Sequence, residues 1–254
     1  RVRLLDVAPE VDGAMELIEK CHDKAVISLA HTCADYHTAM QAFDAGASHM
    51  THLYNAMPPY SHRAPGPIGA AADKEKVEVE LITDGVHIHP ASVRTTFKIF
   101  GDGRIIFISD SMRATGLDDG EYTLGGQDVK VTGNRAVLAD GTIAGSATNL
   151  LDCMRTAVLR MGIPLESAVK CATANPAKSV GIYDEYGSIS PGKKADVVLL
   201  RKEDLSLKHV ILEGGSKSGA NPYVRISRRF AASTFVPRQQ ICSNGSGPLS
   251  QNTA

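Results

Sequence analysis

The sequence predicts an α/β protein built around a parallel sheet. Over residues 1–111, short apolar segments of strand length alternate with amphipathic segments of helical length. Several of these apolar segments, such as "IIFIS" and "AVIS", carry no polar alternation, which is typical of strands covered on both faces. Histidines and aspartates recur just after them. Because right-handed crossovers connect such units, the pattern indicates a parallel α/β sheet or a barrel.

The elements of this first part follow one another in a regular order. Helical spacing of Val11, Met15 and Ile18 indicates the first helix, and Gly46 is a suitable stop after the second. A segment rich in Pro and Gly, residues 58–67, is typical of a loop. Strands are expected at residues 2–7, 25–31, 49–54, 77–85 and 104–111, and helices at 11–24, 34–46 and 90–100.

The second part of the chain has a different pattern. Residues 112–147 carry strand-like segments with Gly-Gly, Gly-Asn and Asp-Gly turns, which indicates β-hairpins inserted after the last strand of the parallel sheet. Two helices are expected next, over 148–162 and 164–181. The expected domains are therefore a sheet-and-helix domain over 1–185 with its hairpin insertion, a small antiparallel β unit over 186–215, and a loosely ordered tail over 216–254.

Composition narrows the functional classes. The 254 residues carry a formal net charge of −1, which gives no basis for attraction to nucleic acid or a membrane surface. No apolar run approaches the roughly 20 residues of a transmembrane helix. The five cysteines form no CxxC pair, so neither a disulfide framework nor a thiolate metal site is indicated, and a reducing cytoplasm is the expected location.

Polar residues gather at one edge of the expected sheet. His31, His52, Asp84 with His87, and Asp110 each follow a different strand. Because the carboxyl ends of parallel strands meet at one face, we expect these side chains to lie close together, where active sites of such folds sit. A lone histidine at a strand end is more often structural, but the coincidence of all these positions favours function.

Two imidazoles and a carboxylate are a suitable ligand set for Zn²⁺, with iron and manganese as alternatives. Asp110 is placed to accept a proton from an activated water and pass it on, although an aspartate here could also begin a helix. His87 could contact a substrate carbonyl or only pair with Asp84. Arg63 in its loop, beside Asn55 and the backbone of Ala56, could receive a phosphate or carboxylate.

Three segments resemble the N-acetylglucosamine-6-phosphate deacetylases of the amidohydrolase superfamily. They are "LAHTCADYHTAMQAFDAGASHMTHLYNAMPPYSHRAPG", "ITDGVHIHP" and "ISDSMRATG". "ATANPAKSVG" followed by "GSISPGKKADVVLL" resembles the closing pattern of the superfamily, so the likeness covers about residues 1–215. The resemblance implies a metal-bearing (β/α)₈ barrel of the TIM type beside a small β-sandwich, in a cytoplasmic homodimer. It also implies a hydrolase that converts N-acetylglucosamine 6-phosphate to glucosamine 6-phosphate and acetate.

The resemblance also implies a role for each matching position. His31 and His52 match metal ligands, Asp110 matches the aspartate that activates water and then protonates the amine, and His87 matches a histidine that contacts the substrate and polarises its carbonyl. The remaining matches are positions that contact substrate: Asn55, Ala56 and Arg63 for the phosphate, and Ile143, Ala144, Gly145 and Ser146 in a loop.

One departure from the family is large. Family members carry a glutamate ligand in an "EGP" motif upstream of the segment that matches "LLDVAPE", and Glu10 in that segment is not this glutamate. We therefore expect an N-terminally truncated deacetylase with about strands 4–8 of the barrel and a remnant of the sandwich. Glu10 or Asp110 could replace the ligand weakly. The alternatives are an inactive structural remnant and an amidohydrolase for another amide, such as a cyclic ureide.

Overall fold

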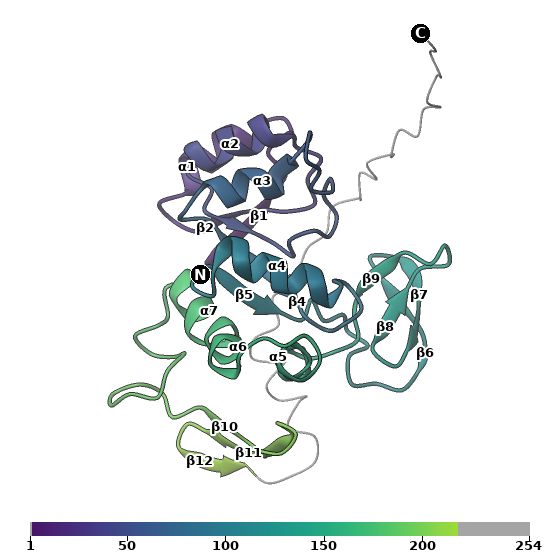
Figure 1. Ribbon diagram of the computed structural model, residues 1–254, viewed down its shortest axis with the longest axis vertical. Helices are drawn as coiled ribbons and strands as arrows, with labels where there is room; N and C mark the ends of the chain where they lie inside the picture. The colour runs from purple at the N-terminus through teal and green to yellow at the C-terminus, as the bar shows by residue number, and fades with distance from the viewer. Residues whose placement is uncertain (1, 218–254) are drawn as a thin grey trace.

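A parallel sheet of five strands organises the protein. The computed structural model describes residues 2–217, and residues 1 and 218–254 lie outside the described part. The sheet has the order β1-β2-β3-β4-β5, in which each strand pairs with its neighbour in sequence (Figure 1). The strands are β1 (Leu4–Val7), β2 (Val26–Leu29), β3 (His49–Met50), β4 (Glu78–Ile82) and β5 (Ile105–Ile108). The α/β class predicted from the sequence is confirmed.

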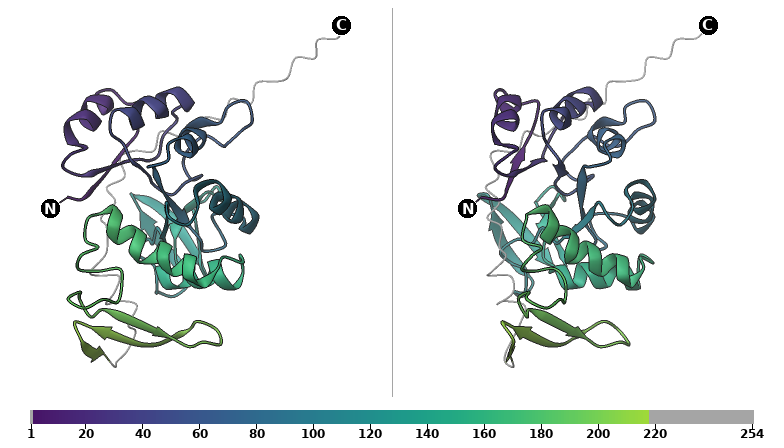
Figure 2. Two further views of the ribbon diagram at one scale, coloured as in Figure 1. Left: turned by 60° about the vertical axis from the view of Figure 1, so that its left-hand side comes forward. Right: turned by 90° about the vertical axis from the view of Figure 1, so that its left-hand side faces the viewer.

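Helices connect successive strands and pack against the sheet (Figure 2). They are α1 (Ala14–Cys21), α2 (Tyr36–Asp44), α3 (Gly66–Asp73) and α4 (Pro90–Phe100). Local signals explain their ends: the Asp35 side chain accepts from the Thr38 N–H at the start of α2, and α4 runs from Pro90 to the residue before Gly101, whose φ is 67°. The sequence did not predict α3, because its short Gly- and Ala-rich segment follows directly on the Pro/Gly loop.

The third strand is much shorter than expected. The sequence predicted a strand over 49–54, but β3 contains only His49 and Met50. His52 and Tyr54 have φ values of 34° and 79°, in the left-handed region, where a strand cannot continue. Residues 51–54 therefore form a turn, and the extended prediction was wrong because apolar and aromatic residues in a buried turn resemble a strand in sequence.

The hairpin insertion and the helices after it follow. A four-stranded antiparallel sheet contains β6 (Gly120–Leu124), β7 (Gln127–Thr132), β8 (Arg135–Val137) and β9 (Ile143–Ser146). After it come α5 (Leu150–Leu159), α6 (Leu165–Ala172) and α7 (Ala174–Ser179). The expected helix over 164–181 is thus two helices, because Thr173 lies between them with φ −134° and ψ −73°, outside the helical region.

A small antiparallel sheet completes the described part. It contains β10 (Val197–Leu200), β11 (Leu207–Leu212) and β12 (Gly215–Lys217), and lies apart from the hairpin sheet in Figures 1 and 2. β12 extends two residues into the segment 216–254 that was expected to be a loosely ordered tail, and the rest of that segment lies outside the described residues. Within residues 2–217, no helix is long and apolar enough to span a membrane.

The main hydrophobic core lies between the parallel sheet and its helices. It joins side chains from β1 to β5 with others from α1 to α6, among them the fully buried Ile27, Leu81 and Ile105. A smaller core under the hairpin sheet includes Met112, which follows closely on Asp110. The main core therefore supports the loops at the carboxyl ends of the strands, and the smaller core supports the segment after Asp110.

Candidate active site

Two histidines meet beyond the ends of β2 and β3. The Nε2 atoms of His31 and His52 are 2.9 Å apart, and their rings form an edge-to-face pair. His31 has a φ of 47° and His52 a φ of 34°, so both occupy a backbone conformation that costs an L residue about 1–2 kcal/mol. Such strain persists only where neighbouring contacts impose it, and it is common at functional sites.

Desolvation favours the uncharged form of both histidines, although His52 is buried and the His31 residue is exposed. Desolvation lowers the pKa of His31, and the nearby His52 lowers it further, while Asp110 and Asp6 oppose the change. Desolvation likewise lowers the pKa of His52, which is 5% exposed. Within the described part of the chain, His52 Nδ1 is buried without a hydrogen-bond partner. Neutral imidazoles are ligands that a divalent cation binds, once the proton shared between the two Nε2 atoms has left.

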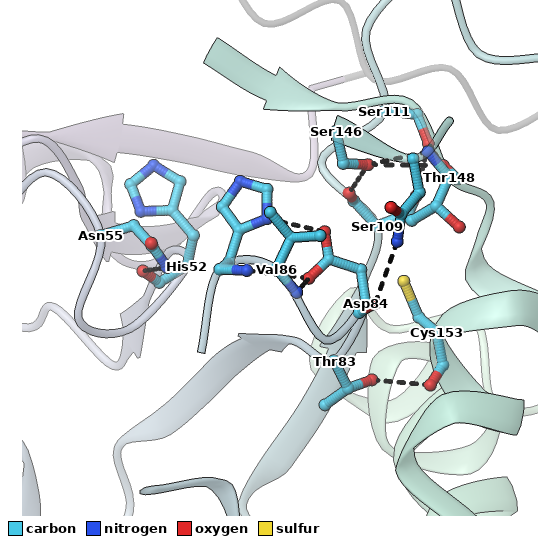
Figure 3. A network of polar contacts seen from close by, with 12 residues as sticks. His52, Asn55, Thr83, Asp84, Val86, Ser109, Ser111, Ser146, Thr148 and Cys153 are labelled. Atoms are coloured by element: carbon cyan, nitrogen blue, oxygen red, sulfur yellow. Dashed lines mark hydrogen bonds and ion pairs between the residues drawn. The ribbon is translucent and has the colours of Figure 1, made fainter. Parts of the chain in front are cut away.

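The loop after β4 carries a second pair. His87 Nδ1 lies 2.8 Å from Asp84 Oδ2, and the other carboxylate oxygen of Asp84 accepts from the backbone N–H groups of Val86 and His87 (Figure 3). Burial opposes ionisation of Asp84, but these hydrogen bonds outweigh it and lower its pKa. An ionised Asp84 accepts the Nδ1 proton of His87, so the Nε2 side of that ring is left for another partner.

Asp110 follows β5 and is fixed from the side of the hairpin sheet. Its backbone oxygen accepts from the Ser146 N–H at 2.9 Å, and Met112 N–H donates back to the Ser146 oxygen at 2.8 Å. The Ser146 hydroxyl donates to the Ser109 oxygen in the cluster drawn in Figure 3. Desolvation raises the pKa of Asp110, and the nearby His87 and His31 partly offset it. The result is a carboxylate of increased basicity within electrostatic reach of both histidine pairs.

A chain of polar side chains, of which Ser28 and His49 are buried, runs from β1 across β2 to β3 below the histidine pair. Thr51 Oγ1 donates to Asp6 at 2.6 Å and lies 2.7 Å from Ser28 Oγ, which in turn is 2.9 Å from His49 Nδ1. Since the hydroxyl proton of Thr51 goes to Asp6, Ser28 must donate to Thr51. The remaining contact then requires His49 to donate its Nδ1 proton to Ser28. Burial lowers the pKa of His49 to about 4, so its ring is neutral and Nε2 is unprotonated.

Glu80 continues this chain to the histidine pair. Its Oε1 faces His49 Nε2 at 3.8 Å, and its Oε2 accepts from the backbone N–H of His52 at 3.3 Å. Burial raises the pKa of Glu80 to about 8, and the charge of Asp6 adds to the effect. A neutral Glu80 acid is compatible with an unprotonated His49 Nε2, because its hydroxyl can point toward that nitrogen.

The Glu10 carboxylate, considered from the sequence as a replacement metal ligand, binds a loop instead. Its Oε2 accepts from Thr32 Oγ1 at 2.5 Å and its Oε1 from the Cys33 N–H at 2.6 Å, so both oxygens bind the loop that follows His31. Among residues 2–217, no three His, Cys, Asp or Glu side chains are arranged to hold a metal ion, which leaves Glu10 and Asp110 outside a ligand set with the histidine pair. The hypothesis of Glu10 as a replacement ligand is not supported by these contacts.

Comparison with known proteins places this geometry in a family. The model of the amidohydrolase family matches residues 7–219. The chain belongs to the amidohydrolase family. Its relatives include the N-acetylglucosamine-6-phosphate deacetylase of Bacillus subtilis, 42% identical over 203 residues, and the N-acetylgalactosamine-6-phosphate deacetylase of Escherichia coli O157:H7, 35% identical over 214 residues.

Solved structures agree with these relatives. An aspartate-to-alanine variant of the Mycobacterium smegmatis N-acetyl-D-glucosamine-6-phosphate deacetylase, in complex with N-acetyl-D-glucosamine-6-phosphate, has a TM-score of 0.80 and 39% identity to this amidohydrolase. The match covers 84% of this chain and 57% of that one. For the Bacillus subtilis relative, the alignment covers 80% of this chain and 51% of the relative. This amidohydrolase chain therefore spans about half the length of the curated relatives it matches.

The structure also locates the residues expected to bind a phosphate. Asn55 lies in the turn after His52, where its side-chain amide donates to the His52 and Leu53 oxygens. Ala56 is exposed, with a φ of 50°. Arg63 is exposed in the following loop, and its Nη1 lies 2.7 Å from His62 Nε2. These residues belong to the same connection between β3 and α3 as His52, whereas the loop of Ile143, Ala144, Gly145 and Ser146 is strand β9 and pairs beside Asp110.

Sequence reasoning missed the polar chain below the site. Asp6, Ser28 and Glu80 each stand within an apolar strand segment, where a polar residue signals an interior contact, and Thr51 directly precedes His52. That signal was present in "LLDV", "VISL" and "VEVEL". The partners could not be read from it, because each contact joins residues on different strands.

Proposed function

We propose that this chain is the catalytic part of an N-acetylhexosamine-6-phosphate deacetylase, with N-acetylglucosamine 6-phosphate as its substrate. The observation that carries the proposal is the meeting of His31, His52, His87 and Asp110 at the carboxyl edge of a parallel sheet. It is supported by 42% identity to a relative with that activity. The products are glucosamine 6-phosphate and acetate, as amino-sugar catabolism requires.

His31 and His52 are proposed as two ligands of a divalent metal, which in this family is generally required. Zinc suits two imidazoles, and Fe²⁺ and Mn²⁺ are alternatives. The pair fits this role because desolvation lowers the pKa of both rings and their Nε2 atoms lie close enough to share one cation. When bound, the cation supplies Lewis acidity, which lowers the pKa of water toward about 7.

Asp110 and His87 are proposed to move and hold the protons of the reaction. The raised pKa of Asp110 makes its carboxylate a better base, so it accepts a proton from the attacking water and later gives it to the departing amine. With Nδ1 bonded to the Asp84 carboxylate, the His87 ring carrying a proton on both nitrogens would donate from Nε2 to the acetamide oxygen, where the hydrogen bond stabilises developing negative charge and Asp84 balances the charge of the ring.

The phosphate is proposed to bind at Arg63, Asn55 and the backbone of Ala56. Arg63 is exposed, and its guanidinium, which donates to His62 Nε2 through Nη1, keeps further N–H donors for an incoming dianion. The segment 143–146 is proposed to contact the sugar, since it lies directly beside Asp110. At larger scale, we propose that the five parallel strands are about strands 4–8 of the family's barrel, that the three-stranded sheet is a remnant of its sandwich, and that the active protein is a cytoplasmic homodimer.

The deciding experiment measures acetate release by the purified zinc-loaded chain. N-acetylglucosamine 6-phosphate, its galactosamine epimer and unphosphorylated N-acetylglucosamine are compared, with the Asp110→Asn variant beside the native chain. We expect turnover that needs the phosphate, and at least a hundredfold loss in Asp110→Asn because an amide cannot accept the proton of the attacking water. Arg63→Met is expected to raise KM for phosphorylated substrates alone.

Three results of the acetate-release assay would change the proposed function. Faster turnover of the galactosamine epimer would change the substrate to the one named for the Escherichia coli relative. Equal turnover with and without phosphate would contradict the proposed anion site and favour another amide, such as a cyclic ureide. No acetate release by a folded, zinc-binding chain would contradict the enzyme proposal and support an inactive structural remnant.

A further inference from the structure

A carboxylate forms hydrogen bonds beside each histidine of the proposed metal pair: Glu10 binds the two residues after His31, and Glu80 binds the backbone N–H of His52. We propose that Glu10 and Glu80 are positioning residues, which keep His31 and His52 in the strained backbone conformations that bring their Nε2 atoms together. This inference rests on the proposed metal-binding role of the pair. It assigns roles to Glu10, three residues after β1, and to Glu80 on β4, and these two strands flank β2 and β3, which carry the histidines at their ends.

Glu10 acts on the loop that follows His31. Thr32 donates its hydroxyl to one oxygen of Glu10, and the Cys33 N–H donates to the other, at 2.5 and 2.6 Å. Thr32 is completely buried, and its Oγ1 also accepts from the Ala34 N–H at 2.9 Å. The chain after His31 is therefore fixed at three successive residues, which defines the direction in which it leaves the left-handed residue.

Glu80 acts on His52 directly. Its side-chain Oε2 accepts from the His52 N–H at 3.3 Å, and its backbone oxygen accepts from the Leu53 N–H at 2.8 Å. One residue of β4 thus satisfies two consecutive donors of the turn that ended β3. Glu80 is itself oriented by the polar chain that reaches across β2 and β1 through His49. The two glutamates approach the pair from opposite sides, β1 and β4, so each histidine has its own support.

Neither interaction is needed to complete a helix or a strand ladder. Their shared consequence is the placement of two rings whose Nε2 atoms are 2.9 Å apart, although the loops that carry them follow different strands. Groups that orient metal ligands without touching the metal typically change metal affinity or activity 10–100-fold when removed.

The test compares Glu10→Met and Glu80→Met, which have similar shape but accept no hydrogen bond, with Glu10→Gln and Glu80→Gln, which keep one acceptor oxygen. Glu16→Met is the matched control, because Glu16 is exposed on α1 and pairs with the exposed Lys20. Zinc affinity is measured by competition with a chromophoric chelator, and the visible spectrum of the Co²⁺-loaded protein reports the ligand geometry. The imidazole ¹⁵N signals of the metal-free protein report the ring positions without any metal.

We expect each Met variant to weaken zinc binding 10–100-fold and to alter the Co²⁺ spectrum, whereas each Gln variant recovers most of the affinity and the control resembles the native chain. In the metal-free protein, Glu10→Met should shift mainly the His31 signals and Glu80→Met mainly the His52 signals. Zinc affinity and imidazole signals unchanged in a folded Met variant would overturn the role of that glutamate.

Failure of the proposed function can be told apart from failure of this inference. If the native chain binds no zinc, the metal role of the pair is wrong, and the imidazole signals alone decide whether the glutamates position the rings. If Glu80→Met does not fold, Glu80→Gln and the Glu10 pair still decide the matter, because a glutamine that restores native signals shows dependence on the acceptor itself.

Discussion

His49 shows how a single buried side chain can couple the fold to pH. It is 1% exposed, its Nδ1 proton is held by Ser28, and burial lowers its pKa from 6.5 to about 4. In the unfolded chain His49 binds a proton below about pH 6.5, whereas the folded protein does so only below about pH 4. Its contribution to stability is therefore fully present above pH 6.5 and is lost as the pH falls toward 4.

This difference predicts an acid-sensitive stability that depends on one residue. Between about pH 7 and pH 4, the native chain should lose roughly 3 kcal/mol more of its free energy of unfolding than His49→Gln, because glutamine does not titrate. Urea denaturation at both pH values measures the difference. His22→Gln, at an exposed position, should keep the native pH dependence. Equal pH dependence in His49→Gln and the native chain would contradict the prediction.

Replacing Asp84, the partner of His87, should slow turnover. In Asp84→Asn the neutral amide no longer balances a charge on the His87 ring, so the ring protonated on both nitrogens, which donates from Nε2 while Nδ1 is held, is less stable. We expect kcat to fall about 10²–10⁴-fold with a smaller change in KM. Steady-state kinetics of acetate release measure it, beside the exposed Asp118→Asn. A native kcat in Asp84→Asn would show that the charge of Asp84 does not support His87 in the reaction.

At the scale of elements, β9 determines where Asp110 lies. Gly145 in β9 has a φ of 68°, and a Cβ built there would meet the Asp110 backbone oxygen at 3.3 Å. Gly141 has a similar φ of 86°, but a Cβ there meets nothing within 4 Å. Both glycines thus adopt a left-handed backbone conformation, but only a side chain at position 145 would contact Asp110.

A pair of alanine variants should separate these effects. Gly145→Ala and Gly141→Ala should each cost about 1 kcal/mol of stability through the left-handed conformation. Only Gly145→Ala should also lower kcat, because Asp110 must move by a few tenths of an ångström. Thermal unfolding and acetate release measure the two quantities. Equal kcat in both variants would mean that the position of Asp110 tolerates this shift.

Arg104 joins elements at the opposite, amino-terminal end of the sheet. It precedes β5, and its guanidinium donates to the backbone oxygens of Phe100, Ala71, Lys74 and Val77, which belong to the ends of α4 and α3 and the segment before β4. The arginine therefore satisfies helix-end carbonyls that have no other partner in their own helix.

Removing this arginine should destabilise the fold and leave the chemistry intact. Arg104→Met should cost roughly 2–3 kcal/mol, because several partly buried oxygens lose a charged donor. Lys98→Met, at an exposed position of α4, should change the free energy of unfolding by less than about 0.5 kcal/mol. Denaturant titrations compare the two, and acetate release by folded Arg104→Met should equal the native rate. A loss of kcat without a loss of stability would contradict this division.

At the scale of the whole molecule, metal binding should couple to folding. A cation that binds only the folded chain stabilises it by about 4 kcal/mol at a thousandfold excess over its dissociation constant. We expect zinc to raise the melting temperature of the native chain and a chelator to reverse the rise. The double variant His31→Asn, His52→Asn should show no rise, whereas His22→Asn should behave as native. A rise that persists in the double variant would place the metal elsewhere.

Much of the site follows from the order of elements alone. The alternation of apolar and amphipathic segments determines a parallel sheet, and parallel topology brings the carboxyl ends of successive strands to one face. The placement of His31, His52, Asp84 and Asp110 at those ends could therefore be predicted without coordinates, and so could the hairpins after β5. The start and end of α4 were predictable for a different reason: Pro90 favours the first turn of a helix and Gly101 favours its end, and both effects are local.

Other features were decided only by tertiary structure. β3 ended two residues after it began, because packing forces His52 into a left-handed conformation that its sequence does not favour. Glu10 could be considered a metal ligand from its position, but its carboxylate meets the loop after His31, and Glu80 meets His52 from another strand. Such contacts join residues distant in sequence, and they depend on strand register and burial. Local patterns encode neither, so the supports of the site were visible only in the folded chain.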